Sequence, residues 1–346
     1  MAVTNDLATD RRVLRHTATL REAGCDVVLV GRNEVPTRHG RGWRFYLEFN
    51  LEFNLGLRRK LRELKPDAVW ANDTDTLLGC WLVARKLRKP LVMDAHELFP
   101  EVPEIQGKPF VKWVWRTLER CLMPKCDAML TVCDSIAEYY KEKYGVEMKV
   151  VRNLHTPQSA VQAASSPNLV EQPRMLLYQG KVNLGRGVDW AIDALEWLED
   201  CRLVVAGDGD LLEDMKVYAQ SKPWSDRIEF LGRMKPEELE TLTPKADVGL
   251  VMLEDKGLSY HYALPNRIGD FVQAGVPMVV SDLPEMAAVV RRFGVGEVME
   301  EVGVKSLVEA VRKVLEKGRG GYDFAAARED MDWNKEKVKL IECINV

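Results

Sequence analysis

Short apolar runs alternate with amphipathic segments along most of the chain, and this alternation predicts the fold. The runs have the length of strands and lack a polar face, which is typical of parallel strands that helices cover on both sides. In the first half, the predicted strands are residues 27–30, 68–71, 91–94, 128–132 and 149–152. The helices predicted between them are residues 10–23, 55–64, 76–87, 110–123 and 135–144.

Residues 155–173 interrupt the alternation, because they are rich in Pro, Ser, Gln and Ala and show no period, as a linker does. Strands are predicted again at 174–178, 202–206, 228–231, 248–253 and 277–280. We therefore expect an α/β protein of two Rossmann-like, doubly wound domains that face each other across a cleft. The predicted division is an N-terminal domain over 1–160, a linker over 161–173 and a C-terminal domain over 174–327.

Two local features qualify this pattern. Only three residues precede Thr4, whereas a strand typically has about five to six residues, so we expect a shortened first strand. A tandem Leu-Glu-Phe-Asn at 47–50 and 51–54 is expected to extend one amphipathic segment.

The composition excludes several classes of protein. The 346 residues are 46% apolar and 29% charged, enough for two domains with real cores and unlike disordered or collagen-like chains. No run approaches the roughly 18 apolar residues of a spanning helix, and the first residues do not form a secretory signal. We expect a cytoplasmic protein. The seven scattered cysteines predict buried thiols rather than a zinc or redox site.

The charge is uneven along the chain. Residues 1–160 hold 26 Lys and Arg against 21 Asp and Glu, and the remainder holds 23 against 32. A basic N-terminal domain attracts anionic surfaces, although solvated helix faces account for the same count. The segment 108–116 mixes aromatic and basic residues, as helices at a membrane surface do. The sequence thus predicts peripheral contact with the inner membrane face, with a partly buried helix as the alternative. Nothing points to nucleic acid.

Gly180 and Lys181 follow a predicted strand, and Arg186 and Gly187 open the next helix. Glycine permits close backbone approach, and two cations beside a helix amino terminus are suited to a diphosphate. The order of a Walker loop is absent, and an ordinary charged turn is the alternative.

The second candidate begins at Pro265 and Asn266, which predict the start of a helix with Asn266 as its cap. Asp270 falls on the same face one turn later, where a carboxylate can accept from ribose hydroxyls. A capped helix with a solvated acid is the alternative.

The third candidate lies where two first-half strands end. His96 and Glu97 follow one of them, and Asn72 and Asp73 follow the strand before it. Ligands of doubly wound sheets bind at this edge, so the four residues are expected to share a site. A structural histidine is the alternative.

Taken together and in this order, these motifs resemble the GT-B-fold glycosyltransferases of family four, the retaining nucleotide-sugar enzymes. The resemblance covers nearly the whole chain. It is carried by Asn5-Asp6, Asp10 to Val13, Ala71 to Leu78, Asp94 to Glu104, Gly180-Lys181, Arg186-Gly187, Phe230 to Arg233, Leu264 to Arg267, Ser281 to Glu285 and Trp333-Asn334. Tyr262 stands where the family often has the first Glu of its Glu-x7-Glu motif.

The resemblance implies a role for each of these positions. Lys181 and Arg186, beside Gly180, would hold the donor diphosphate, with further donors from the helix at Pro265 and Asn266. Asp270 would hold the ribose, and Gly232, Arg233 and Met234 would lie against the base. His96 would lie on the acceptor side beside the transferred sugar, with Asn72, Asp73 and Glu97 near it. The segment 328–346 would pack back on the first domain.

These roles predict a glycosyltransferase, of hexosyltransferase type, in polysaccharide or glycolipid biosynthesis. It would move a sugar from a UDP- or GDP-sugar to a glycan, lipid-linked or small-molecule acceptor. Cations and helix N–H groups can stabilise the leaving diphosphate. No Asp-x-Asp pair stands where a metal is expected, so neither metal nor other cofactor is predicted. The alternatives are a nucleotide-sugar epimerase or hydrolase, with Asp94 or Glu97 as the base, and a non-catalytic nucleotide-sugar-binding protein.

Overall fold

The computed structural model describes residues 1–6, 10–32, 43–154 and 173–343, and these form two compact units. Unit 1 comprises Met1–Asn153, Gly257–Ser259 and Asn334–Val346. Unit 2 comprises Leu154–Lys256 and Tyr260–Trp333. The predicted linker, 161–173, lies outside the described residues except for its last position.

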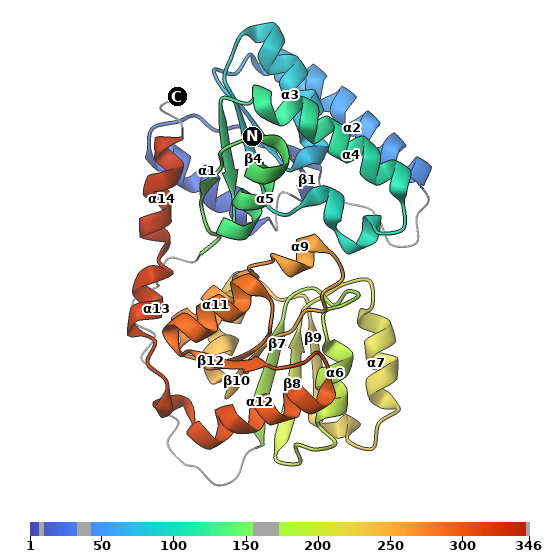
Figure 1. The fold of residues 1–346 in the computed structure, drawn as a ribbon, viewed down its shortest axis with the longest axis vertical. Helices are drawn as coiled ribbons and strands as arrows, with labels where there is room; N and C mark the ends of the chain where they lie inside the picture. Colours follow the sequence, from blue (N-terminus) through green and yellow to red (C-terminus); the bar gives the residue numbers. More distant parts are fainter. Residues whose placement is uncertain (7–9, 33–42, 155–172, 344–346) are drawn as a thin grey trace. The chain divides into compact units, whose positions relative to one another are not determined.

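Unit 1 is built on a six-stranded parallel sheet in the order β2-β1-β3-β4-β5-β6 (Figure 1). Its strands are β1 (Ala2–Asp6), β2 (Val30–Arg32), β3 (Val69–Asn72), β4 (Leu91–Ala95), β5 (Ala128–Thr131) and β6 (Lys149–Val150). All residues of β3 and β4 are buried, as expected for central strands covered on both faces.

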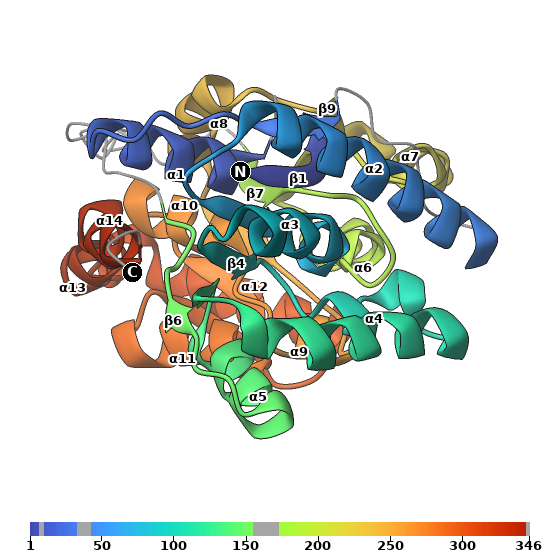
Figure 2. The same ribbon diagram turned by 90° about the horizontal axis from the view of Figure 1, so that it is seen from above.

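The helices of unit 1 connect these parallel strands. They are α1 (Arg11–Glu22), α2 (Trp43–Leu64), α3 (Thr74–Leu87), α4 (Pro109–Leu122), α5 (Asp134–Tyr144) and the C-terminal α14 (Trp333–Glu342). Asp10 caps α1, because its carboxylate accepts from the backbone N–H of Val13 at 3.1 Å. Helices α2, α3 and α4 contact one another, and Figure 2 shows α3 between the other two.

The predicted C-terminal segment 328–346 is divided: unit 1 takes it from Asn334 onward, whereas residues 328–333 belong to unit 2. Glu336 of α14 is buried and accepts from the backbone N–H and the guanidinium of Arg152 at 3.0 and 2.9 Å. Lys149 pairs with Glu342 at 2.7 Å. These contacts tie α14 to the end of β6.

Unit 2 has a second six-stranded parallel sheet, in the order β12-β11-β10-β7-β8-β9. Its strands are β7 (Arg174–Gln179), β8 (Cys201–Ala206), β9 (Ile228–Gly232), β10 (Val248–Val251), β11 (Met278–Ser281) and β12 (Gly296–Met299). Its helices are α6 (Val188–Ala194), α7 (Leu212–Gln220), α8 (Pro236–Leu242), α9 (Leu258–His261), α10 (Asn266–Ala274), α11 (Pro284–Phe293), α12 (Val304–Lys317) and α13 (Ala325–Asp330), with α9 divided between the units. The expected pair of doubly wound α/β domains is confirmed.

The structure differs from the sequence predictions in four places. The first strand is not shortened, since β1 spans five residues. The strand predicted at 27–30 begins instead at Val30, which is the first residue in register with β1, opposite Ala2. Strand β12 was not predicted, since it is a half-buried edge strand without a continuous apolar run. The tandem at 47–54 lies inside α2, which is therefore longer than the predicted helix.

All seven cysteines are free thiols, and four of them (Cys80, Cys133, Cys201 and Cys343) are buried. None of the helices in the described part of the chain is long and apolar enough to cross a membrane.

Candidate functional site

His96 follows the end of β4 and lies between two carboxylates. Its Nδ1 is 3.4 Å from Asp73 and its Nε2 is 3.3 Å from Asp94. Its backbone N–H donates to Asp73 at 2.8 Å. Because β3 and β4 are parallel neighbours, their carboxyl ends bring Asp73 and His96 to one edge, as the sequence predicts.

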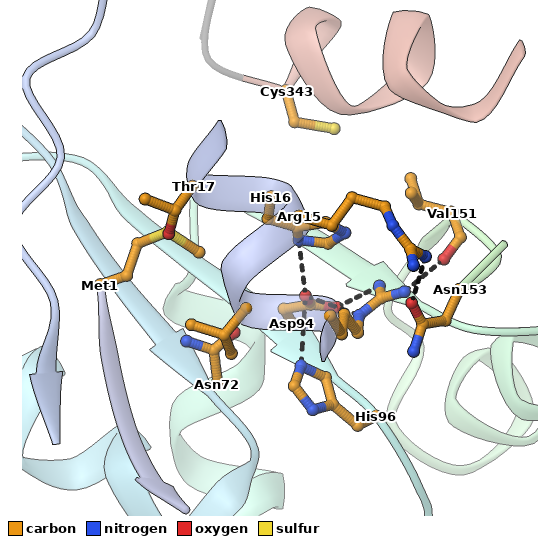
Figure 3. A network of polar contacts seen from close by, with 12 residues as sticks. Met1, Arg15, His16, Thr17, Asn72, Asp94, His96, Val151, Asn153 and Cys343 are labelled. Atoms are coloured by element: carbon orange, nitrogen blue, oxygen red, sulfur yellow. Dashed lines mark hydrogen bonds and ion pairs between the residues drawn. The ribbon is translucent and has the colours of Figure 1, made fainter. Parts of the chain in front are cut away.

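Asp94 lies between His16 and His96 in this cluster (Figure 3). The carboxylate is fully buried and accepts from the guanidinium of Arg12 at 2.6 and 3.0 Å. His16, also buried, lies 3.2 Å away. Arg12 in turn donates to the backbone oxygen of Val151 at 2.6 Å, which connects α1 to the segment after β6. Sequence analysis did not identify Arg12 and His16, although a cation and a histidine four residues apart in an amphipathic helix were a usable signal.

The cluster controls the protonation of its members. Burial alone would lower the pKa of His96, but the charges of Asp73 and Asp94 outweigh it and raise that pKa to about 9. Burial, assisted by Arg12, lowers the pKa of His16 to about 4. Burial of Asp94 is outweighed by Arg12 and His96, which hold its pKa well below the usual range. At neutral pH His96 is therefore an imidazolium, which donates hydrogen bonds and cannot serve as a base.

Asp73 holds His96 at the cost of backbone strain. Its φ of 59° and ψ of 167° fall at the border of a region occupied almost only by glycine, where other residues cost about 1–3 kcal/mol. It precedes α3 but its carboxylate does not cap that helix and turns to His96 instead. Burial raises the pKa of Asp73 to about 6, against the opposing charge of His96.

The other two acceptor-side candidates lie differently. Asn72 is fully buried, and its amide donates to the backbone oxygen of Ala2 at 2.8 Å, which ties β3 to β1. Glu97 is exposed beside His96. The first is thus placed to support the sheet and the second to reach solvent.

In unit 2, the Gly180 loop lies at the carboxyl end of β7. Gly180 has φ of 130°, and a Cβ there would lie 2.9 Å from the Arg267 guanidinium. A Cβ at Gly207, after β8, would lie 1.7 Å from the backbone oxygen of Gly180. Both glycines are needed because two strand ends and a buried side chain meet here.

The two predicted diphosphate cations already have partners. Lys181, 59% exposed, pairs with Asp208 at 2.7 Å. Arg186 donates to the hydroxyl of Tyr260 at 3.1 Å, and its guanidinium lies 4.8 Å from the centre of that ring. A phosphate that binds Lys181 therefore competes with Asp208.

Arg267 is the residue of this site that sequence analysis missed. It is buried, donates to the backbone oxygens of Gln179 and Met252 at 3.0 and 3.3 Å, and lies over the Tyr178 ring. Burial lowers the pKa of Arg267, and the charge of Arg186 lowers it further. Its position in the first turn of a predicted helix, beside Pro265 and Asn266, was the available signal.

The start of α10 differs from the prediction in one respect. Pro265 is the capping residue and Asn266 is the first helical residue, so Asn266 does not cap the helix. Among the described residues no side chain caps the first turn, in which the N–H of Ile268 already donates to the oxygen of Pro265 at 3.0 Å and the N–H groups of Asn266 and Arg267 remain for a ligand. One turn later, Asp270 accepts from the Gln179 amide at 2.7 Å, and that amide accepts from Thr243 at 3.0 Å.

The residues predicted beside the base lie at the end of β9. Gly232 closes this strand with φ of 67° and pairs with Ala206 of β8, and Arg233 and Met234 follow it. Since β7, β8 and β9 are adjacent and parallel, the Gly180 loop and Gly232 share one sheet edge. Within the described residues, no group of three His, Cys, Asp or Glu side chains could hold a metal ion.

Comparison with known families gives two matches that together span most of the chain. The family model described as Glycosyltransferase Family 4 matches residues 9–156. The one described as Glycosyl transferases group 1 matches residues 162–338.

Two curated proteins illustrate the similarity in sequence. An alpha-1,4-N-acetyl-D-galactosaminyltransferase of Campylobacter jejuni, whose name specifies a diNAcBac-PP-undecaprenol substrate, is 27% identical over 197 residues, 56% of this chain and 50% of that protein. The alpha-monoglucosyldiacylglycerol synthase of Streptococcus pneumoniae is 24% identical over 203 residues, 53% of this chain and 46% of its own. The chain thus spans about half the length of these relatives.

A solved structure extends the likeness in fold to the whole chain. The structure of HepE from Anabaena in complex with UDP-glucose has a TM-score of 0.75 at 13% identity, over 99% of this chain and 98% of that one.

Proposed function

Because the chain belongs to the group 1 glycosyltransferases, we propose that it transfers a sugar from a nucleoside diphosphate sugar to an acceptor hydroxyl. The observation that carries the proposal is the edge of the unit 2 sheet. This edge carries Gly180, Lys181 and Arg186. The first turn of α10, which no side chain caps, lies beside them, and the buried guanidinium of Arg267 lies between these groups.

The chemistry follows from where charge develops. Breaking the bond between the anomeric carbon and the diphosphate places negative charge on the leaving nucleotide. Lys181, Arg186 and the N–H groups of α10 are fixed positive or donor groups that stabilise this charge. We propose that transfer needs no metal ion and retains the anomeric configuration.

In unit 1, His96 is proposed to contact the transferred sugar as a hydrogen-bond donor. Both of its ring nitrogens face carboxylates, which keep the ring charged and oriented. Asp73 is the more exposed of the two carboxylates, so it can release His96 and accept a hydrogen bond from a sugar hydroxyl instead. Asp94 cannot do so, because it is paired with Arg12. His96→Ala should therefore spare nucleotide binding and lower the transfer rate. Unchanged transfer would make His96 structural.

The same geometry excludes one of the two acids that an epimerase or hydrolase would use as its base, and leaves the exposed Glu97 as the other. Such an enzyme needs a base that reaches its substrate, and Asp94 was one candidate. Asp94 is fully buried and paired with Arg12 on both oxygens, so it cannot take a proton from a ligand. Labelled donor, incubated with and without acceptor, separates the alternatives: transfer, conversion without acceptor, or neither for a binding protein.

We propose a UDP-sugar as donor and a lipid-linked or glycan acceptor. Support comes from HepE, which binds UDP-glucose, from the Campylobacter jejuni relative, whose name specifies a lipid-linked substrate, and from the Streptococcus pneumoniae relative, whose name specifies a glycolipid product. A GDP-sugar is the second candidate for the donor.

We further propose that unit 1 contacts the cytoplasmic face of a membrane. On α4, Phe110 and Trp113 stack with ring centres 6.0 Å apart and are 53% and 62% exposed. The same helix buries Val111 and Trp115, and its Lys112 and Arg116 pair with Glu101 at 2.6 and 2.5 Å. Aromatic side chains that protrude beside basic ones are typical of an interfacial helix.

Nucleotide binding is the first test of the proposal. Thermal unfolding is measured with UDP, GDP, ADP, dTDP and NAD, each with and without magnesium. A ligand at about 100 times its dissociation constant adds roughly 2.7 kcal/mol, a shift of several degrees. We expect a magnesium-independent rise with one nucleoside diphosphate. A rise with NAD alone would contradict the transferase proposal.

A further inference from the structure

Glu119 of α4 is an acid that the proposed transfer reaction does not use. Its side chain is fully buried and forms no ion pair within the described residues. One of its oxygens accepts from the hydroxyls of Thr74 at 2.9 Å and Tyr140 at 3.0 Å, and the other accepts from the hydroxyl of Tyr144 at 2.9 Å. Thr74 belongs to α3 and both tyrosines belong to α5. The carboxylate therefore joins three helices of unit 1.

An acid in this place is costly, because burial favours the neutral form of a carboxyl group. Burial raises the pKa of Glu119 to about 7, although the three hydroxyl donors and the charge of Lys143 oppose the rise. An apolar side chain of similar size would fill the space without this cost. The ability to accept hydrogen bonds is thus what distinguishes Glu119 from a packing residue.

Thr74 connects Glu119 to the site at His96. It is the first residue of α3 and directly follows Asp73, whose backbone is strained. Strained conformations persist only where the surrounding structure fixes them. On one side, the backbone N–H of Asp73 donates to the backbone oxygen of Asp94 at 2.9 Å. On the other side, the hydroxyl of Thr74 is held by Glu119, so Asp73 is fixed between β4 and α4.

A second threonine of this turn does not replace the contact with Glu119. The hydroxyl of Thr76 donates to the backbone oxygens of Asn72 at 2.9 Å and Asp73 at 3.3 Å. These acceptors precede Thr76 by four and three residues, so the two bonds shape the turn and do not tie it to another helix.

The group that Asp73 holds in turn is His96. One carboxylate oxygen of Asp73 accepts from the backbone N–H of His96 at 2.8 Å, and the other lies 3.4 Å from its Nδ1. A rotation of the Asp73 backbone would move both oxygens together, and the imidazole would lose its orientation. A displacement of about 1 Å in a reacting site can lower a rate about 100-fold.

We propose that Glu119 is a positioning residue for sugar transfer, because through Thr74 it fixes the backbone of Asp73 and so orients His96 toward the sugar. The proposal rests on the proposed function of His96 as a hydrogen-bond donor to the transferred sugar. Glu119 contacts neither substrate, and its effect reaches His96 only through the beginning of α3.

The test removes the hydroxyl of Thr74. Thr74→Val keeps the shape of the side chain without the donor, and Thr74→Ser keeps the donor without the methyl group. The matched controls, Tyr140→Phe and Tyr144→Phe, each remove another hydroxyl from the same carboxylate. NMR measures the pKa of His96 in the full chain without substrates, and a transfer assay gives kcat and the KM for the donor. Unfolding temperatures verify that each variant folds.

We expect Thr74→Val to lower the pKa of His96 by about one unit, because a displaced Asp73 stabilises the imidazolium less. The value of kcat should fall about tenfold, and the KM for the donor should not change. Thr74→Ser should restore both the pKa and kcat, and the two phenylalanine variants should leave the pKa at its native value. If they lowered it as much as Thr74→Val, Glu119 would act only through helix packing and the proposal would be overturned.

A double variant verifies that the effect passes through Glu119. Glu119→Met should lower the pKa of His96 as much as Thr74→Val does, and the double variant should lower it no further. Additive shifts would show two separate routes and would overturn the proposal. If Glu119→Met does not fold, the comparison of Thr74→Val with Thr74→Ser decides the question without it.

The two readouts separate this proposal from the proposed function. An unchanged pKa of His96 and unchanged transfer in Thr74→Val would overturn the positioning role and leave the transferase proposal intact. If the native chain transferred no sugar, the proposed function would fail, while a lowered pKa in Thr74→Val would still show that Glu119 orients His96.

Discussion

The guanidinium of Arg267 donates to the backbone oxygen of Gln179 at 3.0 Å, and so links the start of α10 to the end of β7. The same side chain reaches the oxygen of Met252, just past β10. A single buried cation thus holds three elements around the Gly180 loop. Its charge lies beside the proposed diphosphate site, although it was not among the residues predicted to form it.

Arg267→Met is expected to destabilise the chain and weaken nucleotide binding. The change leaves two backbone oxygens without donors, which we expect to lower the free energy of unfolding by about 2–4 kcal/mol. Denaturant unfolding measures this loss. The control is Arg291→Met, whose arginine is exposed and pairs with Asp282, and which should cost less than about 1 kcal/mol. Similar losses in the two variants would contradict the linking role.

Asp208→Asn is expected to strengthen binding of UDP. Lys181 pairs with Asp208, so removal of that carboxylate frees the ammonium group for phosphate. We predict an affinity for UDP that rises several-fold in calorimetry, with no change for uridine. Lys181→Met should have the opposite effect on UDP.

The control for this prediction is Glu213→Gln, which breaks the similar exposed pair of Lys216 and Glu213. Its affinity for UDP should equal that of the native chain. If Asp208→Asn bound UDP no better than this control, Lys181 would not contact the diphosphate.

A comparison of Asp73→Gly with Asp73→Ala isolates the backbone strain. Both variants lose the carboxylate that holds His96, but only glycine adopts the φ of 59° without strain. The glycine variant should be more stable than the alanine variant by about 1–2 kcal/mol. Thermal unfolding of the two measures this difference. Equal stabilities would show that Asp73 stores no strain, and transfer should be low in both.

The charged state of His96 predicts a dependence of stability on pH. Its pKa is raised to about 9 in the folded chain, above the 6.5 of an unfolded histidine. The contribution of protonated His96 to the free energy of unfolding is therefore fully present below pH 6.5. It decreases as the pH rises toward 9, and the total loss is up to about 3 kcal/mol.

His96→Gln is the comparison for that measurement. The difference in unfolding free energy between the native chain and the variant should shrink steadily from pH 6.5 to pH 9. A difference that stays constant over this range would mean that His96 is neutral in the folded chain. The pKa of His96, followed by NMR, should also fall in Asp73→Asn.

The sequence by itself determined the two doubly wound domains and the edge at which each site lies. Apolar runs of strand length define the sheets, and a residue that directly follows such a run must emerge at the carboxyl end. That local rule placed His96 after β4 and Gly180 after β7 correctly.

Only the tertiary structure decided which partners these residues have. The pairing of Lys181 with Asp208, of Asp270 with Gln179, and of Asp94 with Arg12 depends on which strands become neighbours and how deeply each side chain is buried. Sequence spacing predicts neither which strands become neighbours nor how deeply a side chain is buried, because the partners lie 27 to 91 residues apart. Burial then converts ordinary surface residue types such as Arg267 and Asp94 into fixed parts of a site, since a buried charge persists only where the fold supplies its partner.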